Sequence, residues 1–559
     1  MLLFKEIKNR VGLCNLYEEE TEMVVTADGM TYRELREERT PVKLVEVHNV
    51  LYSEWLMETK SACVSFKGSE CAKFDGPGSF VVLDFGKELC GGIRMVTRDA
   101  KGMVKWRLTF GESLTEAYAS IGEKNATNDH SPRDMEVVTG MMSDLTFGQT
   151  GFRFVRVELV EGEWAMLQSI FAVSILPYIE REAEITTNDE LLNEIIKTAA
   201  YTLKLTFQNG YIWDGIKRDR LVWCGDLNPE IITSLYLFGD NENIKNSLDF
   251  LKETTPSDEW MNWIPTYSAW WVINLCDYCK HTGNKKYFRE NKKYAQEIIK
   301  HFDGCIREDG SMNLSNGKGM EFFLDWSTYN GSEETKAGVA AVVMIMANKY
   351  LAIEENAICR RLLSKLSGYL NVDTVHKPIR AFQVLAGRDC AEDAIMLQES
   401  GARGFSTFMA YYILTAMAKN GTEMLSILKE YYGGMLAHGA TSFWEDFDID
   451  WMENSARIDE IPKEGQNDIH GDFGKHCYVK FRHSLCHGWA AGVYSFVVEY
   501  ILGIKIEDGG KKVYFNPHLL GLQDIEAKIP LKKGWLKISI HEDKRKIEAP
   551  KGTEIIQRG

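Results

Sequence analysis

The most informative stretch of the chain is Trp213-Asp214-Gly215-Ile216-Lys217-Arg218-Asp219-Arg220-Leu221-Val222-Trp223-Cys224-Gly225-Asp226. It interleaves three carboxylates with three cations and adds two tryptophans and two glycines. A solvated charged loop would explain the charges alone, whereas the Trp and Gly residues indicate a tight, packed loop. In such a loop Lys217 and Arg218 hold neighbouring acids ionised, while partial desolvation raises the pKa of one carboxyl. The stretch is therefore a candidate site of acid–base chemistry.

The stretch lies near the start of a long helical region. Residues 188–190 can cap a helix, and the apolar positions after them follow helical spacing. From there to about residue 503, about twelve helical segments alternate with loops. The clearest are 226–239, 268–282, 285–303, 333–352, 356–370, 405–419, 421–432 and 484–503. They share no repeat consensus, so an open solenoid is disfavoured and a closed toroid of helical pairs is expected.

The regions before and after the helices have a β pattern. Alternating runs separated by turn residues occur at 79–85, 91–99, 104–112 and 151–160, as in an antiparallel sandwich, and 117–141 resembles a long loop. Short alternating runs return at 511–517, 525–531, 534–540 and 544–550. We therefore expect a β-sandwich domain at 1–184, a helical toroid at 185–503 and a small β-sheet domain at 504–559.

Composition narrows the function classes. The chain has 559 residues, 45% hydrophobic and 26% charged, which is typical of a globular protein of several domains. Its net charge of −16 disfavours binding to nucleic acid or to an anionic membrane surface. The sequence lacks a run of apolar residues long enough to cross a bilayer, and its N-terminus does not resemble a secretory signal. The twelve scattered cysteines fit a reducing compartment, so we expect a cytoplasmic protein.

The tryptophans of the helical region indicate the ligand. Most of them lie between helices beside carboxylates and glycines, in the clusters 212–226, 259–271, 321–326, 441–451 and 482–489. Packing in a helix interior explains one or two buried tryptophans but not five loop clusters. Aromatic rings can stack on sugar C–H faces while carboxylates bind hydroxyl groups. Carbohydrate is therefore the leading ligand class, with Trp326 and Trp444 as candidate stacking surfaces.

Several motifs of the sequence, in their order along the chain, resemble those of a known enzyme family. The run Asp214 to Asp226 (DGIKRDRLVWCGD) is similar to the signature loop of α-L-rhamnosidases, the family-78 glycoside hydrolases. Other segments resemble family landmarks in the same order: LDFGKELCG (83–91), LTFGESLTEA (108–117), GFRFVRVE (151–158), HGATSFWEDFD (438–448) and SLCHGW (484–489). The resemblance implies an (α/α)6 toroid that carries an inverting glycosidase site, preceded by a β-sandwich.

The resemblance assigns roles to individual residues. The sixth position of the signature, Asp219, matches the family's general acid. The acid of the Trp-Glu pair in the later motif, Glu445, matches the general base. Most characterised relatives carry Glu at the acid position, so Asp219 is a departure that shortens the reach of the side chain by about 1.3–1.5 Å.

The remaining assignments concern substrate binding. Asp214 and Asp226 match acids that contact the sugar or tune the site, and Asp226 is the second candidate donor. Arg218 and Trp223 match motif positions that support or line the pocket. His487 falls where the family has a sugar-contacting histidine, although a structural role is equally compatible with the sequence.

The expected reaction is the cleavage of terminal α-L-rhamnosyl residues, or those of a related deoxy-sugar, from a glycoside or oligosaccharide. Asp219 would protonate the departing oxygen and Glu445 would activate water on the opposite ring face. The alternatives are an (α/α)6 enzyme for another sugar or a uronic acid, a relative that binds oligosaccharide without cleaving it, and a phosphorylase. This chemistry requires no cofactor and no catalytic metal, nucleotide-binding glycine motifs are absent from the sequence, and a homo-oligomer is possible.

Overall fold

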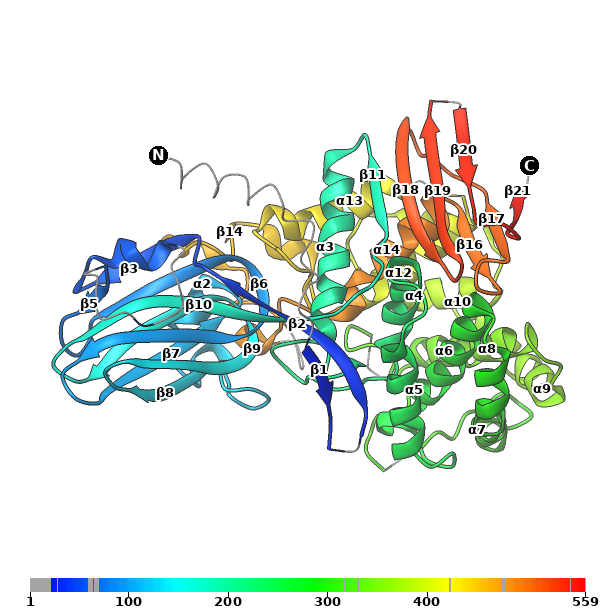
Figure 1. Cartoon of the computed structure of the whole chain (residues 1–559). Coiled ribbons are helices and arrows are strands. Elements are labelled where there is room, and N and C mark those ends of the chain that lie inside the picture. Colours follow the sequence, from blue (N-terminus) through cyan, green and yellow to red (C-terminus); the bar gives the residue numbers. More distant parts are fainter. Residues whose placement is uncertain are drawn as a thin grey trace.

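The computed structural model describes residues 22–27, 29–58, 64, 70–315, 317–328, 331–421, 424–474, 479–542 and 544–557. Within them the order is a β region, a ring of helices and a second β region, as the sequence predicts (Figure 1). Among the described residues, no helix combines the length and the apolar character needed to cross a bilayer.

The first region is a sandwich of antiparallel strands. The strands are β1 (Glu22–Val25), β2 (Thr31–Arg39), β3 (Lys43–His48), β4 (Val50–Leu51), β5 (Ala72–Phe74), β6 (Phe80–Ala100), β7 (Val104–Gly111), β8 (Asp134–Thr139), β9 (Ser143–Glu161) and β10 (Ala165–Pro177). Their main order is β1-β2-β10-β6-β9-β7-β8. Alternate side chains of β6, β7 and β9 point inward and form a separate apolar core around Trp106 and Phe152.

Two details differ from the sequence prediction. The runs 79–85 and 91–99 belong to one strand, β6, because its pairing with β9 continues through register shifts near residues 84–89 and 91–93. The segment 117–141 is not a single loop. It contains the end of the short helix α2 (Leu114–Tyr118) and strand β8, which pairs with β7.

Twelve helices within the described residues form the second region. They are α3 (Glu190–Thr206), α4 (Leu227–Leu237), α5 (Glu242–Thr254), α6 (Pro265–Thr282), α7 (Lys285–Cys305), α8 (Glu333–Leu351), α9 (Ala357–Leu366), α10 (Lys377–Ala386), α11 (Ala391–Gln398), α12 (Thr407–Lys419), α13 (Leu425–Ala437) and α14 (Gly492–Phe496). The predicted segment 484–503 begins later than expected, with the 3-10 turn η8 (Gly488–Ala491) before α14.

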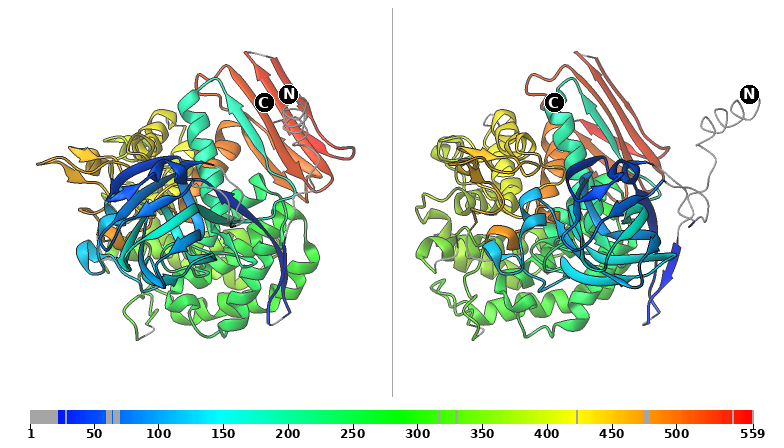
Figure 2. Two further views of the ribbon diagram at one scale, coloured as in Figure 1. Left: turned by 60° about the vertical axis from the view of Figure 1, so that its left-hand side comes forward. Right: turned by 90° about the vertical axis from the view of Figure 1, so that its left-hand side faces the viewer.

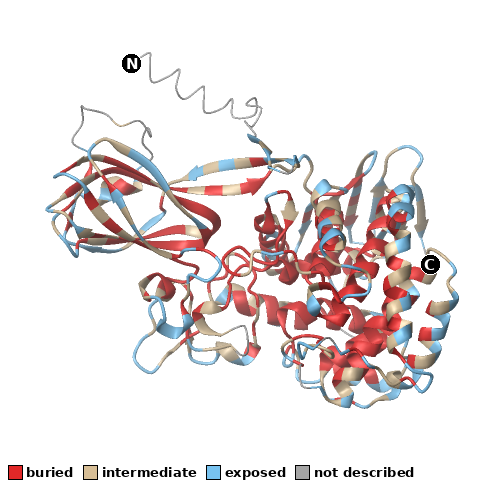
Figure 3. Cartoon of the chain, turned by 90° about the horizontal axis from the view of Figure 1, so that it is seen from below, coloured by how far each residue is buried: buried red, intermediate tan, exposed pale blue. Residues whose placement is uncertain are grey.

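The even-numbered helices α4 to α14 form an inner ring. Each contacts the next, and α14 returns to α4, so the ring is closed. These helices are buried almost all round, whereas outer helices such as α7 keep one exposed polar face (Figure 3). An apolar surface on every side is what a helix between two layers requires. The predicted toroid is therefore confirmed.

The last region consists of small sheets beside the ring. One contains β11 (Glu184–Thr187), β18 (Asp524–Leu531), β19 (Gly534–His541) and β20 (Lys544–Glu548); the other contains β16 (Ile504–Glu507), β17 (Lys512–Phe515) and β21 (Glu554–Gln557). Strand β11, which precedes the first helix of the ring, pairs with β18 near the end of the chain. Figure 2 shows these sheets, largely orange and red, next to α3, and in Figure 1 they lie at the right of the molecule while the strands β6–β9 lie at the left.

Candidate active site

The loops that precede four inner helices enclose a cavity of about 370 Å³ at one end of the ring. Three segments of these loops recur below: the first loop (213–226), which precedes α4, and the second loop (441–448) and the third loop (482–488), which both precede α14. Eight of the nine residues predicted from the sequence line this cavity, namely Asp214, Arg218, Asp219, Trp223, Asp226, Trp326, Glu445 and His487. Residues that are far apart in the sequence therefore meet in one place.

Arg218 connects the two predicted catalytic carboxylates. Its Nη1 lies 3.1 Å from Oδ1 of Asp219, and its Nη2 forms an ion pair with Oε1 of Glu445. The Arg218 and Glu445 side chains are both less than 10% exposed. A guanidinium that forms two hydrogen bonds from separate amino groups fixes direction as well as charge. Arg218 thus holds the first and second loops in a defined relative position.

Backbone contacts fix Glu445 further. Its Oε2 accepts a hydrogen bond from the Ser484 backbone N–H at 2.9 Å, and its own backbone N–H donates to the Ser484 carbonyl at 2.9 Å. Its carbonyl oxygen accepts from Thr407 Oγ1 and from Trp489 Nε1. The carboxylate is therefore ion-paired on one oxygen and bonded to an amide on the other. Both contacts favour the ionised form that a general base needs.

His487 lies at the centre of the acids. Its Nε2 is 3.7 Å from Asp214, 3.9 Å from Asp226 and 4.0 Å from Glu445. Burial, with a smaller effect from Arg218, lowers the pKa of His487 well below its usual range. A lowered pKa favours the neutral imidazole, in which one ring nitrogen can donate a hydrogen bond and the other can accept one. Its Nδ1 is buried and has no hydrogen-bond partner among the described residues. The structure brings His487 into the site as a polar group without charge.

Two buried acids on the first loop hold protons more readily than ordinary carboxyls. Burial raises the pKa of Asp226 well above its usual value, and the neighbouring Asp214 raises it further, although a hydrogen bond from Tyr267 at 3.1 Å opposes the shift. Burial, with a contribution from Asp219, likewise raises the pKa of Asp214. These two side chains can thus act as hydrogen-bond donors towards a ligand.

Asp219 differs from them in backbone and surroundings. Its φ of 56° and that of Arg220, also 56°, lie in the left-handed region, which is uncommon for residues other than glycine. The side chain is 20% exposed, and its Oδ1 is 3.2 Å from Nε2 of His130. His130 belongs to the β-sandwich region, and no sequence pattern predicts its place in the site, because only the folded chain brings it against the first loop.

The tryptophans divide into two groups. Trp223 and Trp326 line the cavity, as do Trp263 and Trp489 of two other predicted clusters. The indole N–H of Trp223 is buried and has no hydrogen-bond partner among the described residues, so it is available to a ligand. The structure does not place Trp444 at the cavity. Its side chain is 1% exposed and packs edge-on against Phe447.

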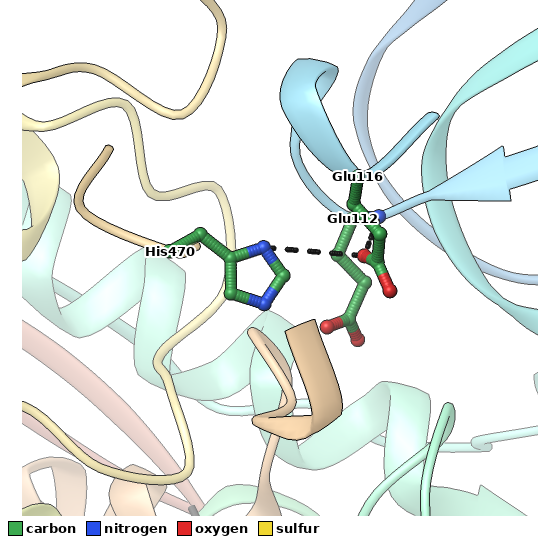
Figure 4. A group of neighbouring side chains, drawn as sticks. All are labelled: Glu112, Glu116 and His470. Atoms are coloured by element: carbon green, nitrogen blue, oxygen red, sulfur yellow. Dashed lines mark hydrogen bonds and ion pairs between the residues drawn. The ribbon is translucent and has the colours of Figure 1, made fainter. Parts of the chain in front are cut away.

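A buried cluster lies behind the site, where the sandwich meets the ring (Figure 4). Glu112, Glu116 and His470 each offer one metal-ligating atom, all within 4.8 Å of one another. Lys217 Nζ lies 3.0 Å from a carboxylate oxygen of each glutamate, so a side chain supplies the positive charge between them. His470 Nε2 donates to the His483 carbonyl at 2.9 Å, which leaves Nδ1 to accept from Ser113 at 2.7 Å. All three side chains are thus engaged within the protein.

Comparison with known families agrees with this arrangement. The model for the bacterial α-L-rhamnosidase six-hairpin glycosidase domain matches residues 180–358. The model for the bacterial α-L-rhamnosidase concanavalin-like domain matches residues 76–176. Among curated protein sequences, none matches the chain.

Solved structures show the same fold. The family-78 rhamnosidase of Bacillus sp. GL1 has a TM-score of 0.72 at 19% identity, covering 90% of this chain and 55% of that one. The rhamnosidase of Klebsiella oxytoca with rhamnose bound has a TM-score of 0.67 at 17% identity, covering 84% and 96%. The Streptomyces avermitilis α-L-rhamnosidase complexed with L-rhamnose has a TM-score of 0.64 at 13% identity, covering 94% and 50%.

The fold thus defines a six-hairpin glycosidase domain joined to a concanavalin-like β domain. The chain spans about half the length of the Bacillus and Streptomyces relatives and nearly the whole length of the Klebsiella one. The chain is thus α-L-rhamnosidase-like in both of these domains, and its fold resembles that of a family-78 rhamnosidase.

Proposed function

We propose that the protein hydrolyses terminal α-L-rhamnosyl residues of small glycosides with inversion at the anomeric carbon. The observation that carries this proposal is the meeting of Asp219 and Glu445 at one cavity, each in contact with Arg218. They are 226 positions apart in the sequence. Two carboxyl groups on opposite sides of a sugar are what an inverting glycosidase requires.

In this mechanism Asp219, in its protonated form, delivers a proton to the departing glycosidic oxygen. Ionised Glu445 takes a proton from a water molecule, which attacks the anomeric carbon from the opposite face. The bond to the leaving group breaks as the bond to water forms, so the sugar leaves with inverted configuration. Arg218 pairs with Glu445 before the proton arrives and keeps the carboxylate charged and oriented.

The other lining residues are assigned to substrate binding. Protonated Asp214 and Asp226 donate hydrogen bonds to sugar hydroxyls, and neutral His487 between them can both donate and accept. The indoles of Trp223 and Trp326 supply flat apolar surfaces for the ring. Asp226 is the second candidate for the acid, because burial raises its pKa and it lines the same cavity.

The compartment is inferred from the thiols. The nine cysteines that the structure describes are all free, and Cys276 and Cys279 lie buried on α6. Free cysteines in this number are typical of a reducing compartment. We therefore propose that the protein acts in the cytoplasm on imported glycosides.

The test is a panel of aryl glycosides with the product followed by NMR. We expect turnover of the aryl α-L-rhamnoside, with β-L-rhamnose appearing before mutarotation. Turnover of another deoxy-sugar or a uronic acid instead would assign a different substrate. Calorimetric binding of rhamnose without turnover of any aryl glycoside would contradict the proposed hydrolysis and favour a binding protein.

A further inference from the structure

Glu112 lies outside the cavity, at the end of β7 in the sandwich, and its side chain is fully buried. Both of its carboxylate oxygens contact loops of the helical ring. Because a buried carboxylate is costly unless it is paired and hydrogen-bonded, its contacts show which groups it organises.

The first set of contacts is with the third loop. Ser484 Oγ donates to Glu112 Oε1 at 3.0 Å, and the Leu485 backbone N–H donates to Oε2 at 2.5 Å. The same Ser484 donates its backbone N–H to Oε2 of Glu445 at 2.9 Å. A single residue, Ser484, therefore stands between Glu112 and the predicted general base.

The second set of contacts is with the first loop. Lys217 Nζ lies 3.0 Å from Glu112 Oε2, and the next residue is Arg218, which pairs with both Asp219 and Glu445. The space here is tight. A Cβ atom on Gly151 of β9 would lie 3.1 Å from Glu112 Oε1 and 3.1 Å from the backbone nitrogen of Lys217. The sandwich therefore packs directly on the backbone of the first loop.

We propose that Glu112 is a positioning residue for the reaction, through which the β-sandwich sets the separation of Asp219 and Glu445. It acts through Lys217 on the first loop and through Ser484 on the third loop. The inference rests on the proposed function, because its consequence is the rate of proton transfer at these two carboxyls. A displacement of about 1 Å at reacting groups can reduce turnover about 100-fold.

Glu116 provides a matched control. It is as buried as Glu112, and its Oε1 lies at the same 3.0 Å from Lys217 Nζ. Among the described residues its carboxylate also accepts from the Glu112 backbone N–H and makes no hydrogen bond to Ser484 or Leu485. Replacing either glutamate by glutamine removes one negative charge beside Lys217. Lys217 Nζ also donates to the carbonyls of Phe481 and His483 at 2.9 and 2.7 Å, so an effect that passes through Lys217 is common to both variants. The two variants therefore differ in the direct contacts with Ser484 and Leu485 and not in the change of charge.

The experiment compares Glu112→Gln, Glu116→Gln, Ser484→Ala and the double variant Glu112→Gln/Ser484→Ala on an aryl α-L-rhamnoside. We expect Glu112→Gln to lower kcat about 10- to 100-fold with KM within about twofold, and Glu116→Gln to lower it less than about threefold. Ser484→Ala alone should also lower kcat, which keeps the test available if Glu112→Gln does not fold. The fall in kcat in the double variant should be smaller than the product of the two single falls, because both substitutions remove the same Glu112–Ser484 contact.

Amide hydrogen exchange gives a readout that does not depend on turnover. We expect Glu112→Gln to speed exchange in both the 217–219 and 484–486 segments, and Glu116→Gln to speed it in 217–219 alone. If the wild type turns over no rhamnoside, the proposed function fails while exchange still tests the link between the loops. Equal kcat losses in the two Gln variants, multiplicative losses in the double variant, or unchanged exchange at 484–486 would overturn the inference.

Discussion

Arg218 and Glu445, 227 positions apart in the sequence, form a buried ion pair that joins the first and second loops. Both partners have a further contact in the cavity: Arg218 Nη1 lies 3.1 Å from Asp219 Oδ1, and Glu445 Oε1 lies 4.0 Å from His487 Nε2. The closed ring of inner helices makes this meeting possible, because loops from its beginning and its end reach the same opening. The chemistry of the site therefore depends on the closure of the ring.

Arg218 contacts Asp219 and Glu445 through two different amino groups of its guanidinium, an arrangement that a lysine cannot reproduce. Arg218→Lys keeps the charge but offers one ammonium group in place of two amino groups directed at different carboxylates. We expect kcat on an aryl α-L-rhamnoside to fall about 10- to 1,000-fold. Arg220→Lys is the control, because Arg220 lies over Trp213 and donates to the Gln149 carbonyl. A large fall in kcat in Arg220→Lys together with an unchanged kcat in Arg218→Lys would contradict the role given to Arg218.

His130 is predicted to orient Asp219. Replacing it in His130→Ala removes a contact of 3.2 Å and leaves the Asp219 side chain held by Arg218 alone among its described ion pairs. If this polar contact is worth as much as one hydrogen bond, about 0.5–1.5 kcal/mol, kcat is expected to fall about 2- to 13-fold. His48→Ala, at an exposed position of β3, serves as the control. Steady-state kinetics that show no difference between the two variants would exclude this role.

Glu230 on α4 links the site to pH-dependent stability. Its side chain is fully buried, neither carboxylate oxygen has a partner among the described residues, and burial raises its pKa well above the usual value. Because the pKa of Glu230 is higher in the folded state than in the unfolded state, its contribution to the free energy of unfolding is fully present below the unfolded-state pKa. That contribution is lost as pH rises through the folded-state pKa.

We therefore expect Glu230→Gln to match the wild type in thermal stability at about pH 4 and to exceed it by about 1–3 kcal/mol at about pH 8. Calorimetric unfolding at the two pH values measures the difference. Glu194→Gln, on the exposed side of α3, should show no such dependence. A Glu230→Gln variant that is less stable than the wild type at the higher pH would show that the charge is compensated.

Sequence and structure agree best where the residues are contiguous. Asp214, Arg218, Trp223 and Asp226 share one short loop, so their association requires no tertiary information. Glu445 and His487 were placed by family resemblance, and the closed ring then brings them to the same cavity. The toroid itself was predicted because about twelve helical segments alternate with loops without a repeat consensus, and because the family resemblance implies it.

The contributions of the sandwich were not predictable. His130 lies in a polar segment without periodicity, and its proximity to Asp219 exists only in the folded chain. Glu112 and Glu116 left a weak signal, since they are two acids four positions apart in LTFGESLTEA (108–117), where burial is otherwise expected. Trp444 looked like a stacking surface because of its neighbour Glu445. In the structure its indole is buried against Phe447 and does not line the cavity.

The central claim is that Asp219 and Glu445 act together as acid and base. Its most direct measurement is the kcat of Asp219→Asn and Glu445→Gln on an aryl α-L-rhamnoside, beside Glu453→Gln at an exposed position soon after the second loop. We predict that kcat falls about 100- to 10,000-fold in each of the first two variants, with thermal unfolding like that of the wild type, and does not fall in the third. Near-normal turnover by both Asp219→Asn and Glu445→Gln would contradict it.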